Sequence, residues 1–407
     1  MSLRREEIGF IHVVASVTGF VIGAGILGLP IKFGECGIGF LPGAILIVIC
    51  GIFQIATAIF LLYVMKALGP GEYTYYVLRL LGRGWWIALY LSVALYAFGA
   101  LEAYVNYGGK AIEVLTNGVI SKPLGMAIYW LAGSIIAFLG ARVLGNAEAV
   151  LVTIFFVLLA AIVGLCIASP SFSIRNLEWM DMSKIFAGFG VTLFAYAAHF
   201  AIPSIGRHFK GEFRKLVLGV VLGFVAPMIG YIAWTAGFMG LLSPEDYTRV
   251  KGLAAPIAVA VLHKVEGFIA VLGYCFGFLT TFTSYVVALY SLARITHEFL
   301  SQLLSRKPSL DTTFWIVALL VLIVDLAAPI TFLGWLDIAG GFGAPLFSGI
   351  IPSLLIIAAA RRKYLEISKT MEIAIYITLA FYVLGTSIFI YNNYVELSSQ
   401  RSSSIRA

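Results

Sequence analysis

The sequence predicts an all-α polytopic membrane protein. We expect eleven transmembrane helices, arranged as two inverted five-helix repeats and one additional C-terminal helix. The first observation is composition: of the 407 residues, 61% are hydrophobic and only 12% are charged. A soluble domain is about 45–50% apolar and about 25% charged, so an ordinary soluble enzyme, a secreted domain and a disordered scaffold are excluded. The second observation is a glycine- and proline-containing interruption that occurs in both the first and the sixth hydrophobic segments.

A membrane-spanning helix needs about 20 mostly apolar residues. Eleven segments meet this requirement: 8–33, 39–66, 85–116, 123–141, 145–168, 184–206, 213–242, 266–300, 312–333, 339–360 and 371–393. The stretch 243–264 contains Pro244, Pro256 and an acidic pair, so we expect a surface loop with short helices there. The predicted organisation is a first repeat at 8–168, a second repeat at 184–360 that carries the 243–264 insertion outside the membrane, and an eleventh helix at 371–393.

The positive charges predict a cytoplasmic N-terminus in a multi-pass protein of the cell membrane. In this orientation seventeen of the 27 Lys and Arg residues fall on the inner side, and such an excess marks cytoplasmic loops. An odd number of spans then places the C-terminus outside. The basic residues form short clusters between apolar runs rather than a stripe, so the net charge of +7 indicates topology and a lipid bilayer, not a nucleic-acid partner.

The interruption in the first span lies before Pro30. Four glycines occur within ten residues there: Gly19, Gly23, Gly25 and Gly28. Each weakens a helix by up to about 1 kcal/mol, and proline cannot donate to the helical ladder. The sixth span has a similar stretch at 194–203 that ends in Pro203, 173 positions after Pro30. Because five spans make up each half, the two halves have opposite orientations.

Matching interruptions in two inverted halves indicate the binding site of a transporter. The N–H groups freed at the start of a half-helix attract a carboxylate, and freed carbonyl groups hold an ammonium group or a cation. Such a site suits a zwitterion. The alternative is that the glycines only permit close helix packing, and the second interruption in the matching position favours the binding site.

These segments resemble the amino acid/auxin permease family of the amino acid–polyamine–organocation superfamily. Residues 23–30 are similar to its first-helix signature, residues 194–203 to its sixth-helix signature, and residues 338–343 with Pro352 to its tenth-helix pattern. The seventh span is most similar to the aromatic amino acid permease branch, through Gly219, Pro227, Tyr231 and Trp234. The resemblance extends over nearly the whole chain.

The resemblance implies the five-plus-five inverted-repeat fold first seen in a bacterial leucine transporter, with alternating access driven by a proton or sodium gradient and no cofactor. It also implies a substrate site. Backbone groups at Gly23, Ala24, Gly25, Ile26 and Leu27 would hold the carboxylate and amine of an amino acid, and the opposite wall would consist of Phe194, Ala195 and Ala198. Tyr104 is also expected to contact the substrate, and Tyr96 and Tyr104 are expected as gate residues of the third span, although tyrosines also gather at membrane interfaces.

Three ionisable side chains are candidates for carrying a coupling proton. Glu102 lies near the middle of the third span, where a carboxylate is costly and suggests function; the alternative is a neutral packing residue. His199 lies in the sixth-span interruption and either carries a proton or ties the two half-helices together. Asp325 is the second choice as a proton carrier, because the ninth span is peripheral in the implied fold and favours a structural role.

A sodium site is the alternative to proton coupling. Its ligands would be the carbonyls of Gly19 and Ile22 with the hydroxyls of Thr280 and Thr281, although such hydroxyls often bond to their own helix. The sodium-coupled relatives carry Asn where this chain has Gly19, which favours the proton. We expect no other metal ion. At the outer ends of their spans, Lys32 is expected as a topology residue and Asp337 as a solvated one.

The sequence therefore predicts a secondary active transporter of neutral hydrophobic or aromatic amino acids. Proton symport is slightly favoured over sodium symport and over exchange. A channel would need a continuous polar stripe or a ring of filter residues, and an enzyme would need a catalytic motif such as H-E-x-x-H or G-x-S-x-G; the sequence has neither. A sensor that binds an amino acid without moving it is a remote alternative.

Overall fold

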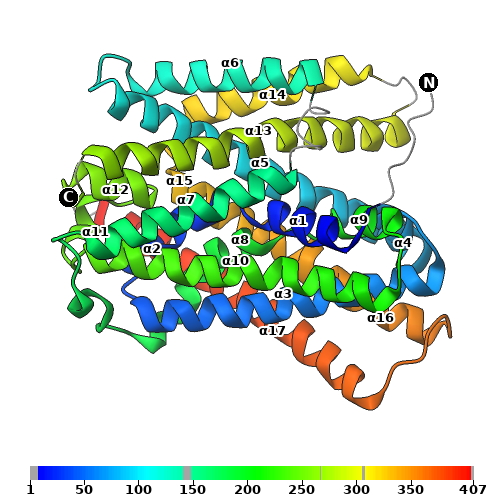
Figure 1. The fold of residues 1–407 in the computed structure, drawn as a ribbon. Coiled ribbons are helices and arrows are strands. Elements are labelled where there is room, and N and C mark those ends of the chain that lie inside the picture. Colours follow the sequence, from blue (N-terminus) through cyan, green and yellow to red (C-terminus); the bar gives the residue numbers. More distant parts are fainter. Residues whose placement is uncertain (1–7, 141–147, 266, 305–307, 405–407) are drawn as a thin grey trace.

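The computed structural model describes residues 8–140, 148–265, 267–304 and 308–404, which form a bundle of helices running mostly along one direction (Figure 1). The helices are α1 (Phe10–Val21), α2 (Gly25–Glu35), α3 (Phe40–Leu68), α4 (Tyr73–Leu80), α5 (Arg83–Leu115), α6 (Lys122–Gly140), α7 (Glu148–Ala168), α8 (Phe189–Tyr196), α9 (Ile202–His208), α10 (Phe213–Leu241), α11 (Asp246–Arg249), α12 (Ala255–Val261), α13 (Gly267–Leu303), α14 (Leu310–Ala327), α15 (Phe332–Ile338), α16 (Ile351–Arg361) and α17 (Lys369–Ser404). Shorter 3₁₀ and π-helical pieces lie at Ile174–Leu177, Met182–Gly188, Ala339–Gly343 and Pro345–Ile350.

Eight helices of the described chain are long and apolar enough to cross a membrane: α3, α5, α6, α10, α13, α14, the continuous rod from α15 to α16, and α17. The pair α1 and α2, bent by 45°, makes a ninth if it is counted as one span. The described apolar part of α7 and the segment from Met182 to the end of α8 are shorter. The chain is therefore an all-helical polytopic membrane protein.

The outward faces of the peripheral helices are apolar, as a lipid-facing surface requires. Leu139 of α6 is 79% exposed, Ile323 of α14 is 58% exposed and Leu384 of α17 is 60% exposed. Contiguous exposed apolar surface of this kind marks an interaction face, and hydrocarbon chains satisfy it. The bundle has two ends, which we call the α12 end, where α11 and α12 lie, and the α9 end, where α4 and α9 lie (Figure 1).

The chain is interrupted at the same two places where the sequence is rich in small residues and proline. After Val21 the backbone becomes extended at Ile22, and α2 starts at Gly25. After Tyr196 the helical ladder stops at Ala197, and α9 starts at Ile202 with Pro203 in its first turn. Proline is favoured at this position because the first N–H groups of a helix have no intrahelical acceptor.

The segment 243–264 contains the short helices α11 and α12, and it is more buried than the surface loop expected from its prolines and charges. Tyr247 packs directly on α2, where a side-chain carbon at Gly34 would lie 2.0 Å from the Tyr247 ring. The segment is closed by an ion pair of Asp246 with Lys264 at 2.8 Å. Burial opposes ionisation of Asp246, but the hydrogen bonds from Lys264 and Ser243 outweigh it and lower the pKa of Asp246.

The rod from α15 to α16 is locally π-helical and approaches α8 without intervening side chains. A Cβ atom added at Gly340 would lie 1.9 Å from the carbonyl oxygen of Gly190 and 2.8 Å from Cβ of Phe194. Gly340, in the predicted tenth span, therefore allows the backbone of the rod to touch the backbone of α8. π-helical turns of this kind occur frequently at functional sites, and this one lies against the helix that precedes the second interruption.

We expect Gly340→Ala to destabilise the protein by about 1–3 kcal/mol, because the methyl group meets a backbone oxygen that cannot rotate away. The matched control is Gly164→Ala on α7, where no atom lies within 4 Å. The measurement is the thermal midpoint of each purified variant, followed by tryptophan fluorescence. Equal midpoints for the two variants would contradict the close contact.

Candidate functional site

A cavity of about 370 Å³ lies between the two interruptions and helices α5, α7 and α13. Its volume falls within the range of about 300–1,000 Å³ that is usual for small-molecule sites. From the first interruption it is lined by residues 19–23 and Gly25, and from the second by Phe194, Ala195, Ala197 and Phe200. We call it the central cavity.

A helix begins at the wall of this cavity. The first N–H groups of any α-helix have no acceptor within the helix, and they carry the positive end of the helix dipole. Helix α2 begins at Gly25 without a side-chain cap, and Gly23 and Gly25 line the cavity. This wall can therefore hold an anionic group without a cationic side chain.

The two interruptions touch each other, and one hydroxyl group serves both. A Cβ atom at Gly25 would lie 2.6 Å from both Cα and Cβ of Ala195. The Tyr231 hydroxyl of α10 lies 2.7 Å from the carbonyl oxygen of Val21 and 2.7 Å from that of Ala195. These are carbonyls at the ends of α1 and α8, which the broken helical ladders leave without a full set of partners.

Aromatic rings enclose much of the rest of the central cavity. The Phe20 and Phe200 rings meet edge to face at 5.8 Å, and the Phe155 and Phe276 rings lie 4.8 Å apart. Tyr96 packs on Phe194 at 5.0 Å, and its hydroxyl donates to the Phe194 carbonyl at 3.1 Å. Edge-to-face and tilted arrangements are favourable for aromatic pairs, so this lining can accept an aromatic side chain.

The structure brings most of the expected substrate-binding residues to the central cavity. Gly23, Gly25, Tyr104, Phe194 and Ala195 line it. The remaining four of the expected set are buried next to the interruptions but lie outside the lining: Ala24, Ile26, Leu27 and Ala198. Tyr96, expected as a gate residue, also lines the cavity.

The residues considered for sodium divide in the same way. Gly19, Ile22 and Thr280 line the central cavity, whereas Thr281 lies outside the lining. The Thr280 hydroxyl donates to the carbonyl of Phe276 at 2.7 Å, and the Thr281 hydroxyl to that of Gly277 at 2.8 Å. Both hydroxyls thus bond to their own helix, which is the alternative that the sequence left open.

The three proton candidates occupy three different surroundings. His199 is fully buried, and its Nε2 lies 2.8 Å from the Thr57 hydroxyl and 3.1 Å from the Gln54 carbonyl, which ties the second interruption to α3. Glu102 is also fully buried, and within the described chain neither of its carboxylate oxygens has a hydrogen-bond partner. Asp325 accepts a hydrogen bond from Asn106.

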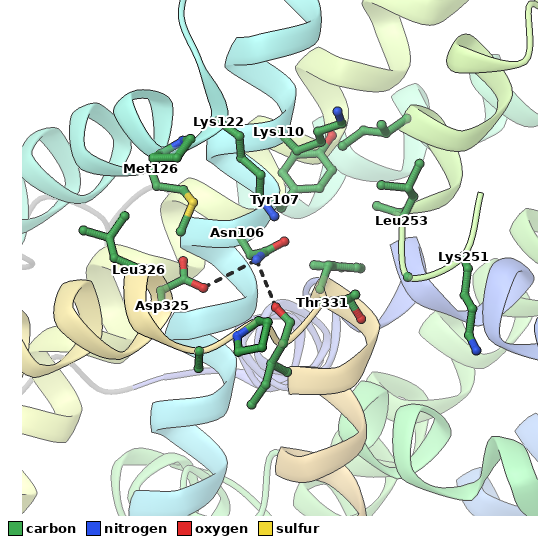
Figure 2. Close-up of a pocket in the computed structure, with 18 residues that line it drawn as sticks. Asn106, Tyr107, Lys110, Lys122, Met126, Lys251, Leu253, Asp325, Leu326 and Thr331 are labelled. Carbon is green, nitrogen blue, oxygen red and sulfur yellow. Dashed lines mark hydrogen bonds between the residues drawn. The ribbon is translucent and has the colours of Figure 1, made fainter. Parts of the chain in front are cut away.

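Asp325 lines a second cavity, of about 300 Å³, between α5, α6, α14 and the segment before α12 (Figure 2). We call it the lateral cavity. The Asn106 amide donates to Asp325 at 3.4 Å and to the Ile330 carbonyl at 3.3 Å. Lys110 and Lys122 also line it. The sequence analysis missed Asn106, although its position one helical turn after Glu102 was a usable signal.

Two charged residues are placed differently from the sequence expectation. Lys32 of α2 and Asp337 of α15 form an ion pair, and their side chains are only 16% and 14% exposed. The expectation of a solvated Asp337 and a surface Lys32 was therefore wrong, because α2 packs against α15 at this level. Nearby, the carboxylate of Glu35 accepts a hydrogen bond from the N–H of Gly252. These contacts fasten α2 at the α12 end.

The described residues contain no group of three or more His, Cys, Asp or Glu side chains placed to hold a metal ion. The lining of the central cavity offers backbone dipoles, hydroxyl groups and aromatic rings. Such a site can bind and release a small polar molecule with an aromatic part. The ionisable groups lie beside it rather than in it.

The sequence matches the model of the Tryptophan/tyrosine permease family over residues 7–390. A Tryptophan-specific transport protein of Haemophilus influenzae is 24% identical over 376 residues, which cover 86% of this chain and 88% of that protein. Tyrosine-specific transport system 1 of the same organism is 25% identical over 243 residues, which cover 58% of each chain.

Two solved structures show the fold. The structure of MhsT in complex with L-phenylalanine has a TM-score of 0.65 at 16% identity and covers 94% of this chain and 98% of that chain. Mhp1, a nucleobase-cation-symport-1 family transporter in a closed conformation with bromovinylhydantoin bound, has a TM-score of 0.63 at 14% identity, with 95% and 91% coverage. The helices of this chain are therefore arranged as in these leucine-transporter-like proteins.

We expect Tyr231→Phe to destabilise the protein by about 1–3 kcal/mol, since two buried carbonyl groups lose the one hydroxyl hydrogen that they share. The matched control is Tyr274→Phe, because the buried Tyr274 hydroxyl has no hydrogen-bond partner within the described chain. Thermal midpoints of both purified variants provide the measurement. A Tyr231→Phe variant as stable as Tyr274→Phe would show that the hydroxyl does not hold the interruptions together.

Proposed function

Since the chain belongs to the tryptophan/tyrosine permease family, we propose that it is a secondary active transporter of aromatic amino acids that works by alternating access. The observation that carries the proposal is the central cavity, where the start of α2 meets an aromatic wall between two chain interruptions. The names of the relatives, which specify tryptophan and tyrosine, support it. The phenylalanine bound to MhsT, a protein of the same fold, does so too.

The cavity offers a separate surface to each part of an aromatic amino acid. The carboxylate would accept hydrogen bonds from N–H groups at 23–25, where the helix dipole also favours negative charge. The ammonium group would bind carbonyls of the residues that follow α1 and α8. The ring would pack among Phe20, Phe155 and Phe200, which line the cavity.

We further propose that the chain has eleven spans in two inverted repeats. In this arrangement the bent pair α1 and α2 is the first span, and α8 and α9 together form its counterpart in the second repeat. The first repeat covers 8–168, the second covers 184–360, and α17 is the additional span. The positive charges favour a cytoplasmic N-terminus and an extracellular C-terminus, so the α12 end is taken as the outer side.

The contacts at the α12 end and the extent of the central cavity support an inward-oriented state. At the α12 end, the pair Lys32–Asp337 and the hydrogen bond between Glu35 and Gly252 fasten α2. The lining of the central cavity extends towards the α9 end, along α13 as far as Ile295. Access from the α12 end would then require α2 to separate from α15, which breaks the ion pair.

For the coupling ion we propose the proton, with Glu102 as its carrier. An ionised carboxylate is costly inside a membrane protein unless it is paired, and Glu102 lacks a hydrogen-bond partner in the described chain. Its neighbour along α5, Tyr104, lines the central cavity. Sodium symport is less supported because the hydroxyls of Thr280 and Thr281 already bond to their own helix, and exchange without net coupling is the remaining alternative.

The proposal is tested by uptake of labelled tryptophan, tyrosine, phenylalanine and alanine into proteoliposomes, with a proton or a sodium gradient imposed separately. We expect accumulation of the aromatic amino acids under the proton gradient.

Gly25→Val should lower uptake by more than about tenfold, because its side chain would overlap Ala195 and displace the start of α2. Gly164→Val, at an open position of α7, is the control. Normal uptake by Gly25→Val would overturn the site.

We expect Glu102→Gln to abolish accumulation under a proton gradient but to retain exchange of internal for external tryptophan, because glutamine keeps the shape of the side chain without a titratable proton. The matched control is Glu113→Gln on the same helix, whose carboxylate pairs with Lys110 near the helix end. Accumulation and exchange are measured in the same proteoliposomes. An unchanged pH dependence of accumulation in Glu102→Gln would remove this residue from the coupling role.

A further inference from the structure

Two buried carboxyl groups lie close together between α5 and α14. Glu102 is fully buried and Asp325 is only 4% exposed. They are neighbours because Asn106, which donates a hydrogen bond to Asp325, lies one helical turn after Glu102 on the same face of α5. Two ionised carboxylates in such surroundings would repel each other across a medium of low dielectric constant. The pair is therefore most stable when it holds at least one proton.

The polar groups around the two carboxyls are unequal. Asp325 accepts a hydrogen bond from Asn106 and faces the ammonium group of Lys122 on α6 and the indole of Trp335 on α15. Glu102 faces only Asp325 and, from α13, the hydroxyl of Tyr285, among the titratable groups of the described chain that act on it. The surroundings of Asp325 therefore stabilise a carboxylate more than those of Glu102 do. When the pair holds a single proton, this proton resides on Glu102.

The lateral cavity connects Asp325 with the surface. Asp325 and Asn106 lie on its wall, with Lys122 above them in the view of Figure 2. Exposed residues of the same lining, Lys251 and Pro123, mark its opening at the α12 end. One oxygen of Asp325 has no hydrogen-bond partner within the described chain. Glu102 lies one helical turn further into the bundle than Asn106, on the same face of α5.

We propose that the lateral cavity is the entry route of the coupling proton and that Asp325 passes this proton to Glu102. This inference rests on the proposed function, in which Glu102 is the carrier. The lateral cavity is separate from the central cavity, since their linings have no residue in common. Proton and substrate would thus reach α5 by different paths.

The transfer step conserves charge and needs no reactant other than water. Asp325 first takes a proton from water in the lateral cavity. Because the two carboxyl groups are not hydrogen-bonded to each other, a water between them relays the proton: it accepts the proton as the O–H bond at Asp325 breaks, and gives up one of its own protons as an O–H bond forms at ionised Glu102. Asp325 is left as a carboxylate, which the amide of Asn106 and the charge of Lys122 stabilise. Asn106 is a positioning residue here, because its amide holds one oxygen of Asp325.

The experiment compares wild type, Asp325→Asn, Asp325→Glu and Asp311→Asn in proteoliposomes that contain a pH-sensitive dye. Asp311 is the matched control because it lies at the exposed start of the same helix. Three quantities are measured for tryptophan: proton entry evoked by substrate, accumulation under a proton gradient, and counterflow exchange at equal pH on both sides. Counterflow also establishes that each variant is folded.

A positioned proton-transfer group typically contributes about 10²–10⁴-fold in rate. We expect at least an approximately tenfold loss of proton entry and accumulation in Asp325→Asn, with counterflow within about twofold of wild type. Asp325→Glu should retain proton entry and accumulation, because glutamate keeps the carboxyl group. Asp311→Asn should behave as wild type in all three measurements.

Normal proton entry in Asp325→Asn, together with its loss in Glu102→Gln, would overturn the entry route and leave the proposed function intact. Loss of counterflow together with proton entry in Asp325→Asn would also overturn it, by showing a structural role. Absence of counterflow in wild type would overturn the proposed transport function and this inference with it. Accumulation by wild type under sodium alone would overturn proton coupling, and the entry route with it.

Discussion

The hydroxyl group of Tyr231 and the contact of Gly25 with Ala195 hold together two helices that are interrupted at the same level of the bundle. Within a membrane, each backbone group released by such an interruption costs several kcal/mol unless protein or water satisfies it. The hydroxyl lies 2.7 Å from one carbonyl of each interrupted helix, and the absence of a side chain at Gly25 allows the two junctions to touch. The central cavity exists because these interruptions are stable, and its donors are the N–H groups that remain free.

Helix α5 contributes residues to both cavities. The residues that it places at the central cavity differ in chemistry from those that it places at the lateral cavity. Its residues Tyr96 and Tyr104 line the central cavity with rings and hydroxyl groups. Asn106 lines the lateral cavity instead, and Glu102 lies buried in the interior of the bundle. A change of protonation between α5 and α14 would therefore act on the helix that forms one wall of the substrate site. This arrangement provides a physical path from proton binding to movement of α5, without any carboxyl, imidazole or cationic side chain in the described lining of the central cavity.

Local sequence signals located the interruptions well, because glycine and proline act on the backbone where they occur. The same signals could not specify which of the consecutive residues 23–27 face the cavity, since that depends on how α2 is rotated against α8. Tyr231 and Asn106 were missed as functional residues because their partners are distant in sequence: Tyr231 bonds a residue 210 positions away, and Asn106 one that is 219 positions away. Lys32 and Asp337 were misplaced for the same reason, as their pairing results from the packing of α2 on α15. The count of eleven spans stays a prediction, because the described apolar part of α7 and the segment that ends with α8 are shorter than the other spans.

A structure of the protein with tryptophan bound, determined in a lipid nanodisc, would test the central cavity as the substrate site. We expect the carboxylate of tryptophan to lie against the N–H groups at 23–25 and its indole ring to lie among Phe20, Phe155 and Phe200. Tryptophan bound in the lateral cavity beside Asp325, or in the central cavity with its carboxylate away from the start of α2, would contradict the account.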